Sequence, residues 1–290
     1  MSAQNVANGK PLIFTKDLGV PLAEEMVGVP HTNADRLPAV VPTQEQKYLF
    51  DNQGYLLLPA VLSDEETEEM RAFCYLLDRD IESVPLAERS PVGGPLQKLA
   101  DHPVILGFMN EFVAHPPFAS PEGYGFRMES TSLQIRKPGM GGFGPHNGSG
   151  LMRLPGDTHT YRCFPGKAHS GLTCVIWELN PVEEGDGGTL FINGSHKSAF
   201  TAPNSIRQPD SPLWQTYSCP AGSLVIFSEA TTHTGTPWTN QERDRVPIFN
   251  RYNTICSRWH RWEPHAELLD AMPPKRQSLF RPVHCEGNPI

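Results

Sequence analysis

The sequence Gly144-Pro145-His146-Asn147-Gly148 is followed much later by Thr231-Thr232-His233-Thr234-Gly235, and each stretch places one histidine in a loop rich in Gly, Thr or Pro. Between them lie short segments in which apolar and polar residues alternate, separated by glycine-rich turns. Alternation with a period of two predicts half-buried β-strands. We therefore expect the two histidine loops to lie at strand ends in one β architecture.

Strand-like segments recur between residues 131 and 252. They lie at 131–136, 171–179, 189–192, 223–227 and 246–252. Short strands separated by clusters of Gly, Pro, Asn and Asp are typical of jelly-roll and cupin-like double sheets. We predict a mainly β fold with flanking helices, in which both loops lie at the mouth of a barrel.

Two capping signatures predict helices nearer the N-terminus. Thr43 followed by Gln46 indicates a short helix, and Ser63 followed by Glu66 indicates a longer helix to about residue 80. Apolar residues at helical spacing predict a third helix at 103–115, and an apolar run predicts a buried strand at 55–58.

Length and composition favour one domain. The chain has 290 residues, of which 38% are hydrophobic, and its mean hydropathy is −0.38. These values are typical of a soluble globular protein with a sizeable core. The proline-rich residues 1–42 are expected to be an arm over this domain, which we place at 43–290 and expect to end in an extended wrap.

The charge and the cysteine content limit which binding partners and which cellular compartment we expect. The formal net charge of −8 argues against nucleic acid. The first residues do not resemble a signal peptide, and the longest apolar runs are too short to cross a bilayer. The six cysteines include no Cys-x-x-Cys pair, so we expect free thiols in the cytoplasm. The expected partner is a small molecule, and the oligomeric state is not indicated.

His146 and His233 are the candidate metal ligands among eleven histidines. A lone histidine is more often a surface or hydrogen-bonded core residue than a ligand, and we interpret the others in that way. These two differ because each lies just beyond a predicted strand, where a rigid sheet can aim an imidazole at a shared point. Spacing alone leaves a metal site and an ordinary polar role equally open.

Three motifs around these histidines resemble the phytanoyl-CoA dioxygenase family. They are Leu133-Gln134-Ile135-Arg136-Lys137-Pro138-Gly139 before His146, the segment 177–197 that ends in Gly-Ser-His-Lys, and the run 221–227 before His233. Asn193 stands where the family usually has proline, and the similarity covers roughly residues 54–252. The resemblance implies a double-stranded β-helix that uses Fe(II), 2-oxoglutarate and O₂ to activate a C–H bond of a small molecule.

The resemblance also implies roles for individual residues. His146 and His233 would hold the iron. Arg245 would bind the distal carboxylate of 2-oxoglutarate, a task that suits a planar guanidinium, and Arg243 stays an alternative because it shares the same strand face by parity. The further candidates for cosubstrate binding are Thr234, Thr236 and Gln134, whereas His196 of the Gly-Ser-His-Lys turn is expected to be structural.

Gly148 departs from the family pattern, which has Asp or Glu two residues after the first histidine. Iron-dependent halogenases of this fold carry Gly or Ala there, which leaves a coordination position for chloride. Alternatively, Asp157 or Glu229 could supply the carboxylate, or the protein could be a non-catalytic, cupin-like binding protein. A glycine also suits a tight loop. Because both histidines and a candidate arginine remain, we expect a working iron enzyme, with hydroxylation and halogenation both open.

The loop 149–167 is expected to cover the site as a lid. Its basic residues Arg153, Arg162 and Lys167 and its aromatic residues Tyr161 and Phe164 would suit an anionic or aromatic substrate. A solvated loop without this role is the alternative.

Overall fold

The computed structural model describes residues 18–21, 29–149 and 158–285. Its largest element is a five-stranded antiparallel sheet in the order β3-β10-β7-β12-β4. The strands are β3 Tyr55–Leu58, β4 Phe126–Leu133, β7 Thr173–Glu178, β10 Ser223–Ser228 and β12 Pro247–Thr254. The central strand β7 is buried along its whole length, as expected for a strand covered on both faces.

A smaller antiparallel sheet covers one face of the large sheet. It has the order β11-β8-β9, with β8 Gly188–Ile192, β9 Trp214–Gln215 and β11 His233–Thr236. Phe191 of β8 stacks on Tyr55 of β3 with 4.3 Å between ring centroids, and Ile176 and Phe249 belong to the same apolar layer. The two facing sheets confirm the predicted double-stranded β-helix.

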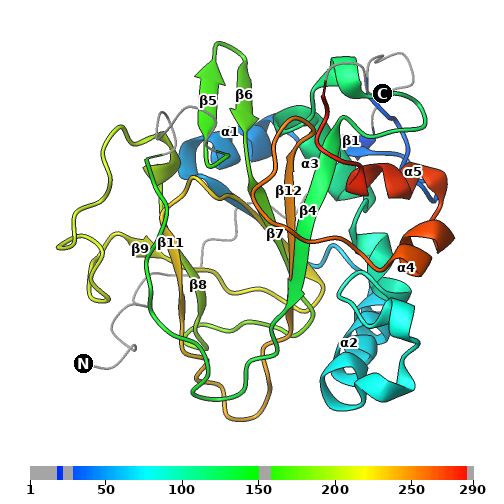
Figure 1. Ribbon diagram of the computed structural model, residues 1–290. Helices are drawn as coiled ribbons and strands as arrows, with labels where there is room; N and C mark the ends of the chain where they lie inside the picture. The colour runs from blue at the N-terminus through cyan, green and yellow to red at the C-terminus, as the bar shows by residue number, and fades with distance from the viewer. Residues whose placement is uncertain (1–17, 22–28, 150–157, 286–290) are drawn as a thin grey trace.

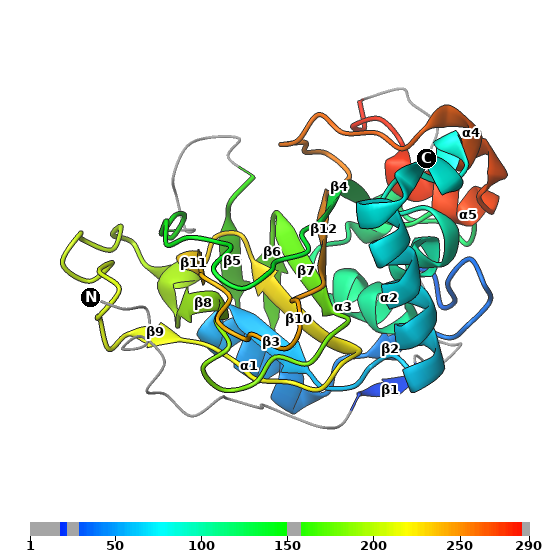
Figure 2. The ribbon, with the colours of Figure 1, turned by 90° about the horizontal axis from the view of Figure 1, so that it is seen from below.

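The helices lie mainly on the other face, as Figures 1 and 2 show for α2 to α5. Their bounds are α1 Gln44–Gln53, α2 Asp64–Arg79, α3 Pro103–Phe112, α4 Ala266–Ala271 and α5 Pro274–Gln277. Thr43 and Ser63 each form a complete capping box, so the two predicted helix starts are confirmed. Gly54, with φ of 86°, ends α1 in a left-handed conformation that suits glycine.

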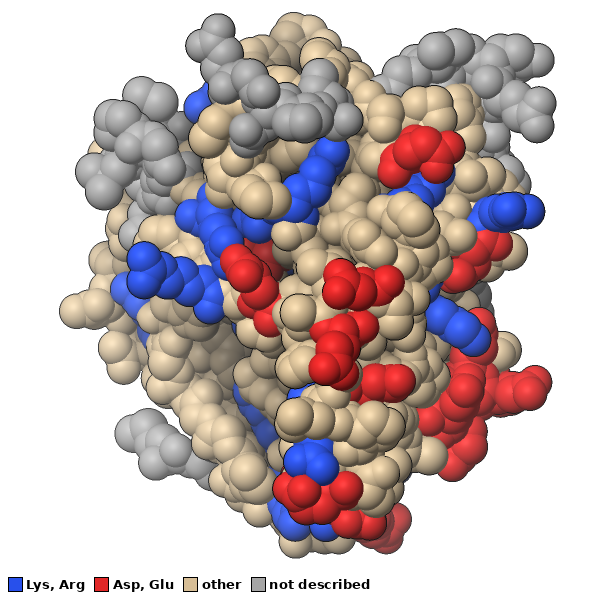
Figure 3. Space-filling view, turned by 45° about the vertical axis from the view of Figure 1, so that its right-hand side comes forward, with Lys and Arg blue, Asp and Glu red and all other residues tan. Residues whose placement is uncertain are grey.

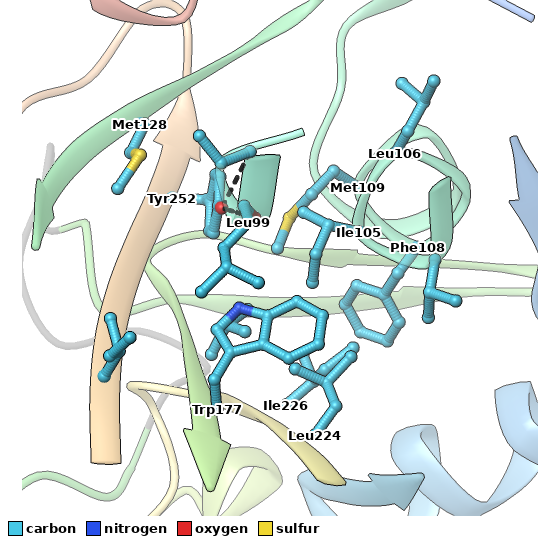
Figure 4. Close-up of a cluster of buried hydrophobic side chains, with 14 of the residues drawn as sticks. Leu99, Ile105, Leu106, Phe108, Met109, Met128, Trp177, Leu224, Ile226 and Tyr252 are labelled. Atoms are coloured by element: carbon cyan, nitrogen blue, oxygen red, sulfur yellow. Dashed lines mark hydrogen bonds between the residues drawn. The ribbon is translucent and has the colours of Figure 1, made fainter. Parts of the chain in front are cut away.

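Trp177 anchors the helix-covered face of the large sheet. Figure 4 shows its indole among Ile105 and Met109 of α3 and Leu224 and Ile226 of β10. Successive residues of a strand point to opposite faces, so the neighbouring Ile176 belongs instead to the layer shared with the small sheet. Strand β7 therefore separates an apolar core from the half of the molecule that holds the histidines.

Two further strand pairs complete the fold. In the described part of the predicted arm, β1 (Val20–Pro21) pairs with β2 (Val40–Val41). In the predicted lid, β5 (Tyr161–Phe164) pairs with β6 (Lys167–Ser170) in a hairpin. The arm-and-domain boundary at residue 42 stays a prediction.

None of the described helices is both long and apolar enough to span a membrane. The face drawn in Figure 3 carries both acidic and basic side chains, with the acidic ones gathered more toward its right side. The charge on this face is therefore mixed rather than uniformly basic.

Candidate metal centre

His146 and His233 lie side by side, although 86 residues separate them in sequence. Their main chains exchange two hydrogen bonds, each of 3.1 Å, and their ring centroids are 4.2 Å apart. His233 opens β11 and is buried, whereas His146 lies in the loop that follows β4 and is exposed. The pairing of this loop with β11 thus brings both imidazoles to one place.

Both imidazoles are oriented by main-chain carbonyls. The Nδ1 atom of His146 lies 2.9 Å from the carbonyl oxygen of Gly144, and the Nδ1 atom of His233 lies 2.9 Å from that of Thr231. Because a carbonyl oxygen can only accept, each Nδ1 carries the proton. Each Nε2 therefore keeps its lone pair, which is the arrangement that metal-binding histidines use.

The charge state of His233 also suits a metal ligand. Burial lowers its pKa to about 4, and His146 acts in the same direction, while Glu229 opposes the shift. The imidazole is therefore neutral at pH 7 and available as a donor to a cation.

Gly148 has no room for a side chain in this backbone. Its φ is +98°, and its neighbours Asn147 and Ser149 also have positive φ, of 61° and 62°. A Cβ atom at position 148 would lie 2.1 Å from Oγ1 of Thr232, whose hydroxyl donates to the Asn147 carbonyl at 3.3 Å. The contact with Thr232 and the positive φ therefore make a side chain at this position strained, where the family pattern has a carboxylate.

Glu229 is the carboxylate nearest to the histidine pair for which a contact is observed. Its Oε2 lies 3.6 Å from Nε2 of His233 and accepts from Asn147 at 3.0 Å. Burial raises the pKa of Glu229, but His233 and Arg251 bring it below the usual value. Because His233 is neutral at pH 7, the permanent charge of Arg251, 3.6 Å away, is the important partner.

A third ligand is not in place within 18–21, 29–149 and 158–285. In these ranges no group of three His, Cys, Asp or Glu side chains has an arrangement that could hold a metal ion. The other predicted alternative, Asp157, lies outside the described residues. The described centre therefore consists of two histidines with an ionised glutamate beside them.

Both histidines line a cavity of about 400 Å³. Its wall also includes the polar residues Gln134, Arg136, Thr234, Glu229 and Arg251 and the aromatic residues Phe227, Phe249 and Trp259. A concave site of this size with a few converging polar groups is typical of a small-molecule pocket.

Arg245 lies behind this cavity rather than in its wall. It is 1% exposed, and its Nε and Nη2 atoms bind the carboxylate of Glu178 at 2.5 to 3.3 Å. Nη2 also donates to Tyr217 at 2.9 Å and to Thr189, a cavity residue, at 3.2 Å. Its Nη1 atom is buried without a hydrogen-bond partner in the described part of the chain.

The other candidates for cosubstrate binding occupy different places. Thr234 lines the cavity and accepts from the Gly144 amide at 2.9 Å. Thr236 is buried and donates to the Gly188 carbonyl at 3.3 Å. Arg243 pairs with Asp186 and Glu183, each at 3.1 Å. Nε2 of His196 donates to the Asp51 carbonyl at 2.9 Å. Gln134 lines the cavity and accepts from Arg136 at 2.9 Å.

In the described part of the predicted lid, the two aromatic residues expected at the substrate lie away from the main cavity. Tyr161 is buried and donates to Asp51 at 2.9 Å, so it belongs to the core rather than to a substrate surface. Phe164 lines a separate hollow of about 250 Å³, and Arg153 lies outside the described residues. Among the described residues of this loop, His159 lines the main cavity, in edge-to-face contact with Trp259 at 4.7 Å.

Glu129 was not singled out from the sequence, yet it shapes the cavity mouth. It is fully buried, and its Oε1 atom accepts from the amides of Trp259 and His260, while Asn253 donates to its Oε2 at 2.8 Å. Trp259 and His260 both line the cavity. A glutamate inside a strand is the sequence signal that could have found Glu129, because acidic side chains are rarely fully buried there without a role.

Solved structures of similar fold support the assignment of the architecture. HygX from Streptomyces hygroscopicus, with nickel and 2-oxoglutarate bound, matches with a TM-score of 0.61 and 20% identity over 79% of this chain and 94% of HygX. SnoN, an α-ketoglutarate-dependent epimerase from nogalamycin biosynthesis, matches with a TM-score of 0.52 and 17% identity over 73% and 83% of the two chains.

A search of curated proteins finds no match to this chain. The family model described as phytanoyl-CoA dioxygenase matches residues 50–245, which include both histidines, Gly148 and Arg245. This match spans more than half of the chain and contains the three motifs that resembled the family in sequence. The chain belongs to the phytanoyl-CoA dioxygenase family.

Proposed function

We propose that the protein is an Fe(II)- and 2-oxoglutarate-dependent oxidoreductase that activates a C–H bond of a small molecule. The observation that carries this proposal is the orientation of His146 and His233. Both Nδ1 atoms are held by carbonyls, so two Nε2 lone pairs are available beside one cavity. Family membership supports the same chemistry.

The residues present fit the proposed groups. Imidazole nitrogen suits Fe(II), and the ionised Glu229 next to the pair favours a divalent cation. Arg245 has a buried Nη1 atom without a partner in the described ranges, and a guanidinium of this kind suits a carboxylate. When bound, iron and 2-oxoglutarate supply with O₂ the oxidising power for the reaction. The protein contributes binding, orientation and a cavity of about 400 Å³.

Halogenation is the second candidate outcome, and Gly148 favours it. The contact that a Cβ atom would make with Thr232 disfavours a carboxylate at this position. A centre with two histidine ligands has more open positions than one with two histidines and a carboxylate, so chloride can bind as well. Glu229 is the rival for that position, because it already lies 3.6 Å from Nε2 of His233.

The substrate is proposed to be a small molecule with several polar groups. One structure of HygX holds hygromycin B, and one structure of SnoN holds nogalamycin RO. The cavity of this chain, with Arg251, His159 and His260 in its wall, offers hydrogen-bonding groups of comparable kind. Trp259, which is 59% exposed, offers an apolar surface at the same site.

Anaerobic titration of the protein with Fe(II) and then 2-oxoglutarate tests the proposal. We expect a weak visible absorption band from the metal–cosubstrate complex, followed by succinate formation when O₂ is admitted. Absence of both would leave the non-catalytic binding protein as the better description. Adding chloride to the anaerobic complex separates the two outcomes: a changed band supports halogenation, whereas an unchanged band up to high chloride supports hydroxylation.

A further inference from the structure

Trp259 presents a large apolar side chain to the main cavity and is 59% exposed. Phe227 and Phe249 line the same cavity but are almost fully buried. The imidazole of His159 meets the indole in an edge-to-face contact, with 4.7 Å between the ring centroids. Exposed aromatic surface inside a concave, partly polar site is typical of a contact with a ligand.

The segment that carries Trp259 has neither helix nor strand, yet side chains hold its main chain in place. It lies between β12 and α4. Oε1 of Glu129 accepts from the amides of Trp259 and His260, and Asn253 of β12 donates to Oε2. From the other side, Nε of Arg258 donates to the His260 carbonyl at 2.8 Å. These hydrogen bonds fix the main chain beneath an indole that is itself exposed.

A β-bulge explains how a glutamate inside a strand reaches this segment. In the described pairing of β4 with β12, Arg251 lies opposite Ser130. The next residue, Tyr252, lies opposite Met128, so Glu129 has no partner in this register. An extra residue of this kind bends its strand and re-aims a side chain, and bulges are common next to active sites. Glu129 therefore serves the segment after β12 rather than the regular pairing of the sheet.

Arg251 gives the same cavity wall a positive charge. Its Nε lies 3.6 Å from Oε1 of Glu229, which is longer than a hydrogen bond, and its guanidinium lies 5.8 Å from the ring of Phe249. Burial lowers the pKa of His260, and the nearby Arg251 lowers it further, so the guanidinium lies close to the residue after Trp259. A planar cation beside aromatic rings suits an acidic ligand and disfavours a cationic one.

We propose that an aromatic ring of the substrate stacks on Trp259, that Arg251 binds an acidic group on this ring, and that Glu129 is a positioning residue for Trp259. This inference rests on the proposed function and narrows its substrate class to aromatic acids. The aromatic contact and the charge-assisted hydrogen bond would hold the ring in the cavity that His146 and His233 also line.

Calorimetry with protein that is loaded with Ni(II) and 2-oxoglutarate tests the proposal without turnover. The probes are 2-naphthoate, 2-naphthamide, which lacks the charge, and decahydro-2-naphthoate, which lacks the aromatic ring system. We expect the wild type to bind 2-naphthoate about 10- to 100-fold more tightly than the amide, as for one charged hydrogen bond. It should bind 2-naphthoate about 3- to 10-fold more tightly than the saturated acid, as for one aromatic pair.

Each variant should lose one of these two preferences. Trp259→Ala should abolish the preference for the aromatic ring, and Arg251→Gln should abolish the preference for the charged probe. Phe164→Ala is the matched control for Trp259→Ala, because it removes a ring that is 60% exposed and lines the separate hollow. It should keep both preferences.

Glu129→Gln tests the positioning role, because an amide group replaces one of the two acceptor oxygens. We expect the affinity for 2-naphthoate to fall about 10-fold, as for one charged hydrogen bond, while the Ni(II) affinity stays unchanged. A merely structural role would lower the free energy of unfolding without changing the affinity for the probe. Glu129→Asp, which keeps the charge but shortens the reach, should also weaken probe binding and serves if the glutamine variant does not fold.

A Trp259→Ala variant that keeps the preference for the aromatic ring would overturn the stacking surface. Wild-type affinity for 2-naphthoate in Glu129→Gln would overturn the positioning role. A wild type that binds Ni(II) and 2-oxoglutarate but none of the probes, or all three equally, would overturn the substrate class and leave the proposed function in place. A protein that binds neither Ni(II) nor 2-oxoglutarate would overturn the proposed function itself.

Discussion

The two faces of the large sheet are built from the same strands but serve different purposes. On one face, Trp177, Leu224 and Ile226 pack against α3 in a cluster of buried apolar side chains. On the other, apolar residues close only part of the space, and the strands lead to a cavity lined by His233, Arg251 and Glu229. Alternating residues of β7 and β10 point to one face or the other, so neighbouring positions have separate roles.

Stability and the proposed chemistry are therefore separable in this molecule. The helix-covered face buries apolar area and contributes folding free energy. The cavity face keeps buried polar groups without a full set of partners, which lowers stability but leaves them available for ligands. Substitutions on the two faces should therefore change different measured quantities.

Trp177→Ala should produce the largest loss of stability on the helix-covered face. The indole is fully buried, and truncation of a buried tryptophan costs about 3–5 kcal/mol. Urea unfolding measures this loss. Trp259→Ala is the matched control because it removes the same side chain from a position that is 59% exposed, and it should cost less than about 1 kcal/mol. Equal losses would mean that the two faces contribute alike.

Glu178→Gln tests the buried ion pair between Glu178, the last residue of β7, and Arg245. The substitution removes the charge that balances Arg245, and breaking a buried ion pair costs about 3–5 kcal/mol. We expect about 3 kcal/mol, because the amide can still accept from Tyr217. Glu183→Gln, whose carboxylate is 66% exposed in its pair with Arg243, is the control and should change the unfolding free energy by less than about 1 kcal/mol. An unchanged stability in Glu178→Gln would contradict the neutralised pair.

His233→Ala should show the opposite pattern, with a large effect on metal binding. We expect Ni(II) affinity to fall about 100-fold or more, because loss of a residue that only hydrogen-bonds to a metal ligand already costs about 10- to 100-fold. Calorimetry with Ni(II) measures the change. His196→Ala, which removes an equally buried imidazole that lies outside the cavity wall, should leave the affinity unchanged. If both variants bound nickel equally well, the proposed ligand pair would be wrong.

Local sequence signals predicted the elements but not all their limits. The capping boxes at Thr43 and Ser63 depend on residues three apart, so a local pattern is sufficient. The strand predicted at 131–136 instead begins at Phe126 and ends at Leu133. Arg127 and Glu129 are buried in its first half, and these polar residues hide the apolar pattern of a strand covered on both faces.

The site was harder to predict where it depends on contacts between distant strands. The family motifs indicated His146, His233 and Arg245. They could not show that Glu178 lies opposite Arg245, because the two are 67 positions apart in sequence. The same holds for Arg136, which becomes a cavity residue only through its pairing with Arg245. Residue spacing carries no information about such charge balance.

Gly148→Asp should give the smallest effects. Made with and without Thr232→Ala, it tests whether the Thr232 hydroxyl prevents a carboxylate at the candidate metal centre. Alone, Gly148→Asp forces a Cβ atom against Thr232 at a φ of +98°, so we expect a loss of about 1–3 kcal/mol in urea unfolding and no gain in Ni(II) affinity. Thr232→Ala removes the opposing hydroxyl. In that background the aspartate has space to approach the histidine pair.

The double variant should therefore bind Ni(II) more tightly than Thr232→Ala alone, by about 10-fold if the carboxylate contributes one charge-assisted contact. Gly148→Ala in the same background is the control, since it adds the Cβ atom without the carboxylate. A tighter-binding, fully stable Gly148→Asp single variant would show that the loop has room for a side chain. The missing carboxylate would then not follow from the contact with Thr232, and Gly148 would have to be explained by the chemistry of the site alone.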